Sequence, residues 1–171
     1  HYEKITRRLN IDDEDLKGRY YADKFEFSPY DQDKHLALRR AYIEGLVWNL
    51  QYYYHKTVSW EWYYPYHYGP MMSDLVGLEP ILNDISFGDE KKKNSIPVGR
   101  PLDPFVQLMA CMPSSKASVL PKPYRWLMTD PSSPIRDYYP SSFTVDMNGK
   151  RWPWEAVVLL PFMDAKRLVD A

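Results

Sequence analysis

The sequence predicts a mainly α-helical domain of irregular arrangement, with a long central helix, an aromatic-rich loop and one small β-hairpin near the C-terminus. Apolar residues recur at three- and four-residue spacing over 32–55, the period of a helix. Apolar and polar residues alternate over 143–147, the period of a half-buried strand. Between these stretches, prolines and aromatic residues crowd a segment that cannot be helical.

Composition limits the class of protein. A length of 171 residues suits one domain, 1–171, and we expect it to be a fragment of a larger protein because it starts without Met and stops in mid-pattern. A net charge of −1 argues against a free-standing basic nucleic-acid binder. The one cysteine, Cys111, excludes an internal disulfide, and its apolar neighbours predict a core position. No apolar run approaches the ~20 residues of a membrane span.

The helix over 32–55 is the longest in the chain, and its wide apolar face predicts that it is largely buried. Ser28 and Pro29 are expected to cap its start. Arg40 and Glu44 are four residues apart and can pair. Gly45 in mid-helix lowers stability by roughly 1 kcal/mol relative to alanine, which indicates that another element approaches closely there.

Shorter elements surround this helix. Further helices are expected over 12–25, 103–112, 123–128 and 161–171. The strand at 143–147 precedes Asn148-Gly149, a strong tight-turn signal, and Trp152 to Trp154 could form a short return strand. Residues 157–160 are read as a buried apolar run.

The segment Ser59–Pro70, called the aromatic loop below, holds two Trp, four Tyr, one His and two Pro in twelve positions. One interpretation is a packed plug whose hydroxyl and indole groups bond to the loop backbone. A second is a platform on which planar bases stack. A third is a surface for sugar rings. Composition alone favours the plug.

Individual residues of the aromatic loop have different expectations. Trp60 and Trp62 alternate along an extended backbone, so one is expected to pack and the other to be presented. Tyr63, Tyr64 and Tyr68 are expected to lie in the core. His67 is expected to be a hydrogen-bonded structural histidine. Because acidic residues are scattered and histidines lack ligand spacing, the sequence predicts no catalytic residue and no metal ligand in this chain.

Long motifs nevertheless resemble the 5′→3′ exoribonuclease family of the Xrn and Rat type. The matching runs are Tyr42–Trp48, Gln51–His55, Ser59–Pro70, Pro104–Met109, Arg125–Pro131, Asp137–Pro140 and Leu160–Asp164. They cover nearly the whole chain from about Asp33. Gly69 departs from the alanine usual in the family, and 154–159 looks more like the cytoplasmic members than the nuclear ones.

The resemblance implies that the chain is the second, mostly helical segment of a processive, Mg²⁺-dependent exoribonuclease acting on single-stranded RNA with a 5′-monophosphate. It implies that Mg²⁺ is held by a preceding nuclease segment, against which this one packs. It also implies that a tryptophan of the loop, Trp60 or Trp62, stacks on the terminal bases, with Tyr66 and His67 supporting the pocket. This chain alone is then expected to be inactive.

Two alternatives remain beside the nuclease reading. The chain could be a non-catalytic, aromatic-rich module that binds a protein partner, or a sugar-binding module. A cytoplasmic location is expected, with a nuclear one as the alternative, and no membrane partner is expected.

Overall fold

The computed structural model describes residues 13–28 and 30–171, and their side chains from residue 16 onward. The chain forms two compact units, His1–Val98 and Gly99–Ala171. Each unit is described by itself. The expectation of one domain spanning 1–171 stays a prediction.

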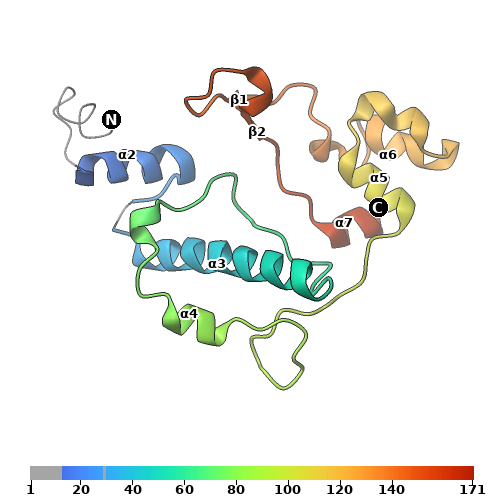
Figure 1. Cartoon of the computed structure of the whole chain (residues 1–171). Coiled ribbons are helices and arrows are strands. Elements are labelled where there is room, and N and C mark those ends of the chain that lie inside the picture. Colours follow the sequence, from blue (N-terminus) through green and yellow to red (C-terminus); the bar gives the residue numbers. More distant parts are fainter. Residues whose placement is uncertain (1–12, 29) are drawn as a thin grey trace. The chain divides into compact units, whose positions relative to one another are not determined.

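The first unit is built around α3 (Gln32–Tyr54), which lies between α2 (Asp13–Phe25) and α4 (Glu79–Asp84) (Figure 1). Tyr21 of α2 and Leu38 of α3 are fully buried and cluster with the buried Phe27, and five further apolar side chains pack around them. On the α4 side, Arg40 Nη1 lies 2.6 Å from Asp84 Oδ2. Helix α2 ends where Glu26 takes a left-handed φ of 58°.

The start of α3 differs from the expectation. Its N-cap is Asp31, whose carboxylate accepts the Lys34 N–H at 3.2 Å. The prediction of a cap at Ser28 is therefore wrong, because Asp31 is the residue positioned to bond an unpaired N–H of the first turn. Pro29, like Asp12 at the expected start of α2, lies outside the described residues.

Helix α3 is less buried than its wide apolar face predicts. Leu38, Ala41 and Ile43 are buried. In the second half, Leu50 is 59% exposed and Tyr53 is 80% exposed. The expectation of a largely buried helix is wrong for this half of α3, because the segments that pack on α3 leave Leu50 and Tyr53 exposed.

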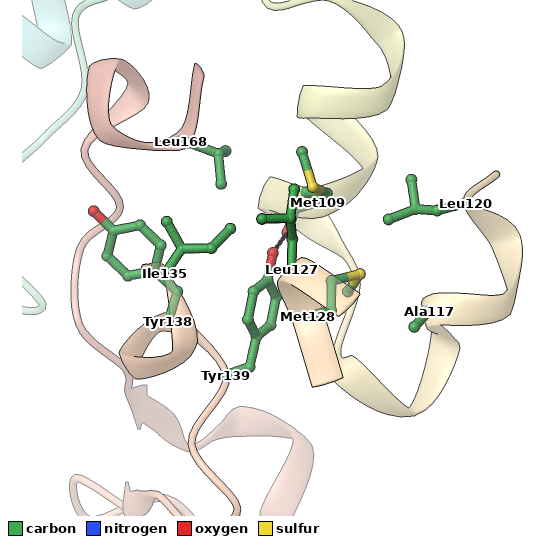
Figure 2. Packing of buried hydrophobic residues seen from close by; sticks show 9 residues of the cluster. All are labelled: Met109, Ala117, Leu120, Leu127, Met128, Ile135, Tyr138, Tyr139 and Leu168. Carbon is green, nitrogen blue, oxygen red and sulfur yellow. Dashed lines mark hydrogen bonds between the residues drawn. The ribbon is translucent and has the colours of Figure 1, made fainter. Parts of the chain in front are cut away.

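The second unit has its own core, formed by short elements. Met109 of α5 (Pro104–Cys111), Leu127 and Met128 of α6 (Arg125–Thr129), and Leu168 of α7 (Ala165–Asp170) converge around Ile135 (Figure 2). The remaining short helical turns of this unit are η2 (Ser114–Val119), η3 (Lys122–Tyr124), η4 (Arg136–Tyr138) and η5 (Pro153–Glu155), whereas η1 (Met72–Asp74) belongs to the first unit. Contrary to expectation, Cys111 is exposed, because it lies at the last turn of α5.

The hairpin pairs β1 (Thr144–Asp146) with β2 (Val157–Leu159) in antiparallel register, Val145 opposite Val158. Asn148 and Gly149 have φ of 46° and 71°, which agrees with the tight turn expected there. The return strand is not Trp152 to Trp154, because Pro153 starts the turn η5 instead. Val158 is 43% exposed, so the run 157–160 is not the buried one expected.

The prediction of a mainly helical fold with a long central helix, an aromatic-rich loop and one C-terminal hairpin is confirmed. Within the described ranges, no helix is long and apolar enough to cross a membrane.

Candidate nucleic-acid interface

Ser59 fixes the start of the aromatic loop. The residue is 1% exposed, and its hydroxyl donates to the Pro97 carbonyl at 2.7 Å. The same oxygen accepts the N–H groups of Glu61 at 3.3 Å and Trp62 at 3.1 Å. A hydroxyl that bonds to backbone groups two and three residues ahead holds a turn in one conformation.

Two further hydrogen bonds fasten the backbone beside Trp60. The Trp48 indole N–H donates to the Ser59 carbonyl at 3.0 Å, so α3 holds the residue before Trp60. The Trp60 N–H donates to the Val98 carbonyl at 2.7 Å. The backbone at Trp60 is therefore tied to a helix and to a distant stretch of chain.

Trp62 packs onto α3. Its indole N–H donates to Glu44 Oε2 at 3.2 Å, and its ring lies against Gly45. The ring also stacks on Trp48, with centroids 6.5 Å apart and planes 24° from parallel. Glu44 is held in turn by Arg40, whose Nε lies 2.8 Å from Glu44 Oε1, as the sequence predicted.

Trp60, in contrast, presents its side chain to solvent, with 53% of the residue exposed. Alternation along the loop therefore separates the two tryptophans as the sequence predicted, Trp62 packing on α3 and Trp60 pointing away from the core. An exposed indole on a fixed backbone is available to a planar ligand.

The end of α3 adds rings that were not among the sequence-predicted site residues. Trp48 stacks on Tyr52, with centroids 5.3 Å apart and planes 10° from parallel. Trp62, Trp48 and Tyr52 therefore form a continuous column, and Tyr53 meets Tyr52 edge-on at 5.7 Å. The signal in the sequence was Trp48 followed four residues later by a tyrosine, because residues at that spacing share a helix face.

The second half of the loop packs against α2. The Tyr64 hydroxyl donates to the Tyr68 carbonyl at 2.7 Å, and burial raises the pKa of Tyr64 well above its ordinary value. The Tyr20 hydroxyl donates to the Gly69 carbonyl at 2.7 Å. Tyr68 is buried and Tyr64 half-buried, as expected, but Tyr63 is 52% exposed, so its expected core position is wrong.

Tyr66 and His67 lie in different surroundings from the column on α3. The ring of Tyr66 is half-buried and meets Phe25 at 5.9 Å and Tyr64 at 5.5 Å. His67 is exposed. Their support of a substrate pocket stays a prediction.

No metal centre accompanies the loop in the described part of the chain: no three His, Cys, Asp or Glu side chains gather there in a way that could hold an ion. The aromatic loop therefore offers stacking surfaces and hydrogen bonds.

Comparison with known proteins places this arrangement in a family. Residues 2–171 match a family model described as the Xrn1 helical domain. The chain belongs to this family. The resemblance found in the sequence motifs is thereby confirmed.

Individual relatives agree with the Xrn1 helical domain assignment. The chain is 46% identical over 159 residues to 5′-3′ exoribonuclease 2 of Arabidopsis thaliana, covering 91% of this chain and 14% of the relative. It is 44% identical over 156 residues to 5′-3′ exoribonuclease 1 of Saccharomyces cerevisiae, covering 91% of this chain and 9% of that protein. The chain thus spans a small part of the proteins it matches.

Identity does not separate the two types of relative. To 5′-3′ exoribonuclease 1 of Homo sapiens the chain is 39% identical over 181 residues, covering 99% of the chain and 10% of that protein. Identity to relatives named exoribonuclease 2 extends from 46% down to 40%, and identity to those named exoribonuclease 1 is 44% and 39%, so the two sets of values overlap. The Xrn1 helical domain family is the level of assignment that they support.

Proposed function

We propose that this chain is the helical segment of a processive, Mg²⁺-dependent 5′→3′ exoribonuclease that hydrolyses 5′-monophosphorylated RNA. In this proposal the aromatic loop supplies one wall of the substrate pocket, and Trp60 is the ring that stacks on a base. The observation that carries the proposal is the exposed Trp60 indole on a fixed backbone. The relatives' name, 5′-3′ exoribonuclease, supports the reaction.

A stacking wall suits an enzyme that must accept every nucleotide in turn. Stacking of a base on an aromatic ring contributes ~1–3 kcal/mol whatever the base, because every base has a π-face. A ring whose backbone is already ordered loses less conformational entropy on binding. Trp60 therefore favours sequence-indifferent contact with single-stranded RNA.

Trp62 is assigned a positioning role in the same proposal. Its indole N–H is bonded to Glu44, and its ring packs against Gly45 and stacks on Trp48. Because Trp62 and Trp60 share the turn held by Ser59, packing of Trp62 on α3 fixes the direction in which Trp60 points.

The described residues do not fit a Mg²⁺ site, since no three metal-ligating side chains gather among them. The proposal therefore assigns the Mg²⁺-binding carboxylates and the pocket for the 5′-monophosphate to a preceding nuclease segment. No step is assigned to a metal held by this chain.

The exposed face of α3 is where we place contact with that nuclease segment. Leu46, Leu50 and Tyr53 follow one another at helical spacing and are 51%, 59% and 80% exposed. Contiguous apolar surface of this kind marks an interaction site. Charged replacements at Leu50 are expected to separate the two segments when they are produced as separate chains.

A cytoplasmic location completes the proposal, with a nuclear location as the alternative. Its support is the likeness of residues 154–159 to the cytoplasmic type. Imaging of the full-length protein with a fluorescent tag tests this assignment, and accumulation in the nucleus contradicts it.

Activity of the chain by itself is the first test. We expect the purified chain, incubated with 5′-phosphorylated RNA and Mg²⁺, to leave the RNA intact. Progressive 5′→3′ decay, absent from a mock purification, contradicts the assignment of the catalytic carboxylates to another segment.

The stacking role is tested in the full-length protein. Trp60→Ala is expected to reduce kcat/KM on 5′-phosphorylated RNA by roughly 5- to 150-fold, the equivalent of one lost stack of ~1–3 kcal/mol. Trp126→Ala is a matched control, because this tryptophan of α6 is also about half exposed, at 45%. If Trp60→Ala retains full activity, the stacking role is contradicted. The aromatic loop is then a packed plug, and the protein-binding module is the favoured alternative.

A further inference from the structure

A second pair of tryptophans lies outside the aromatic loop, in the turn that connects β1 to β2. Trp152 and Trp154 have ring centroids 4.9 Å apart and planes only 8° from parallel. They are 45% and 76% exposed. One face of Trp154 is covered by Trp152, and the high exposure of Trp154 leaves its other face open to solvent.

The backbone of this turn is ordered around the pair. Glu155 Oε2 accepts the Trp152 N–H at 3.3 Å, and the Glu155 N–H donates to the Trp152 carbonyl at 3.0 Å. The first bond ties the Glu155 side chain to the start of η5, and the second is the backbone bond that closes this turn. Pro153 between the rings has a fixed φ. The two rings are therefore held in place without a ligand.

Positive charge accompanies the rings. The Arg151 guanidinium lies 5.0 Å from the ring centroid of Trp152, and Lys150 beside it is exposed. The nearby carboxylates are engaged with the backbone: Glu155 as above, and Asp146 by accepting the Asn148 N–H at 2.8 Å. Lys150 and Arg151 are both exposed beside the rings and available to phosphates, whereas the carboxylate of Glu155, also exposed, is bonded to the Trp152 N–H.

We propose that Lys150, Arg151, Trp152 and Trp154, called the hairpin platform, form a second binding site for single-stranded nucleic acid. A base stacks on the open face of Trp154 and continues the ring column, and Arg151 and Lys150 contact the adjacent phosphates. The site needs neither a 5′-phosphate nor Trp60, so it stands independently of the proposed function.

The geometry favours a nucleic acid over a proline-rich peptide, the other common ligand of exposed aromatic side chains. Proline-rich peptides dock into grooves between aromatic side chains. Parallel rings 4.9 Å apart leave no groove between them. A single open indole face with flanking cations matches a base followed by its phosphate.

The test is fluorescence anisotropy with the 171-residue chain and a 3′-labelled oligouridylate of about ten nucleotides that carries a 5′-hydroxyl. We expect Trp154→Ala to weaken binding at least about fivefold, and Trp154→Phe to retain most of the affinity. Arg151→Gln is expected to reduce the slope of log K against log salt by about 0.7, the loss of one phosphate contact to a single strand. Trp126→Ala is the control, because Trp126 is another exposed tryptophan of the same unit, at 45% on α6.

Thermal unfolding of each variant accompanies the titrations, and because Trp154 is 76% exposed its replacement is expected to leave Tm unchanged. The hairpin platform is rejected if the oligouridylate does not bind, if Trp154→Ala binds as tightly as the unmodified chain, or if only a proline-rich peptide binds. Because the probe has no 5′-phosphate, these outcomes are separate from failure of the 5′-end site.

Discussion

The ring of Trp62 occupies the space that a side chain at position 45 would need. A Cβ added to Gly45 would lie 2.9 Å from Cη2 of Trp62, closer than real Cβ atoms approach other groups. The ring cannot move away freely, because its N–H is bonded to Glu44 and its face stacks on Trp48. The glycine thus lets the aromatic loop pack directly on α3.

This contact gives a double-mutant prediction. Gly45→Ala is expected to lower the free energy of unfolding by about 1 kcal/mol, because the cost of overpacking exceeds the gain in helix propensity. In a Trp62→Ala background the same change is expected to raise stability by about 1 kcal/mol, because only the propensity gain remains. Urea unfolding of the four proteins measures the coupling. Equal effects of Gly45→Ala in both backgrounds contradict the contact.

The two tryptophans of the loop are expected to differ in their effect on stability. Trp62→Ala removes a packed ring and a hydrogen bond, and we expect a loss of about 2 kcal/mol. Trp60→Ala removes an exposed ring, so its effect is expected to stay within about 0.5 kcal/mol. Urea unfolding compares both with the unmodified chain. A larger loss for Trp60→Ala shows that Trp60 is the packed residue.

The sequence predicted that one of the two tryptophans packs and the other is exposed, but not which one. Alternation predicted that Trp60 and Trp62 face opposite ways, and Gly45 predicted a close approach to the long helix. Which of the two tryptophans packs beside Gly45 depends on the hydrogen bonds that tie the loop to Pro97 and Val98, and these are formed only in the tertiary structure. Ser59 and Pro97 are almost forty positions apart, so their hydrogen bond produces no periodic pattern in the sequence from which it could be predicted.

Tyr139 in the second unit provides a further prediction. Its hydroxyl donates to the Met109 carbonyl at 2.8 Å in the core (Figure 2), and burial raises its pKa to about 12. Met109 lies in the last turn of α5, where carbonyls lack helical partners. Tyr139→Phe is expected to cost about 1–3 kcal/mol in urea unfolding, because that buried carbonyl loses its partner.

Tyr124→Phe is the matched control for Tyr139, since Tyr124 is 42% exposed and water can replace its hydroxyl contacts. A loss below about 0.5 kcal/mol for Tyr139→Phe, no larger than the surface effect, contradicts a structural role for this bond.

Asp74 predicts a pH dependence of stability in the first unit. Burial by itself would raise the pKa of Asp74, but hydrogen bonds from Lys17 and Tyr21 hold it below the ordinary 3.8. A carboxyl with a depressed folded pKa stabilises the fold above its unfolded pKa. This contribution is lost as the pH falls from about 3.8 through the folded pKa.

Asp74→Asn is therefore expected to lower stability at pH 6 and to lose less stability than the unmodified chain between about pH 5 and pH 3. Asp170→Asn, an exposed residue of α7, is the control. If the stability of Asp74→Asn and that of the unmodified chain change in parallel with pH, the hydrogen bonds around Asp74 do not contribute to the pH dependence of stability.

Features that depend on residues close in sequence could be predicted, but the burial of Leu50 and Val158 could not. The turn at Asn148-Gly149 and the Arg40–Glu44 pair follow from residues close in sequence, and the structure has both. Leu50 and Val158 look like core residues by pattern but are exposed. Pattern identifies an apolar face, whereas burial depends on which other element covers that face. The stacked Trp152–Trp154 pair likewise could not be predicted, because the sequence indicated a return strand where the structure has the turn η5.

The central claim is that Trp60 stacks on a base of the substrate. The most direct measurement is the fluorescence of 2-aminopurine placed at the 5′-terminal position of a 5′-phosphorylated RNA bound to the full-length protein without divalent metal. Stacking on an indole quenches this fluorophore. We expect quenching by the unmodified protein and by Trp62→Phe, and loss of quenching with Trp60→Ala. Quenching that survives Trp60→Ala and disappears with Trp62→Phe would contradict the account and assign the stack to Trp62.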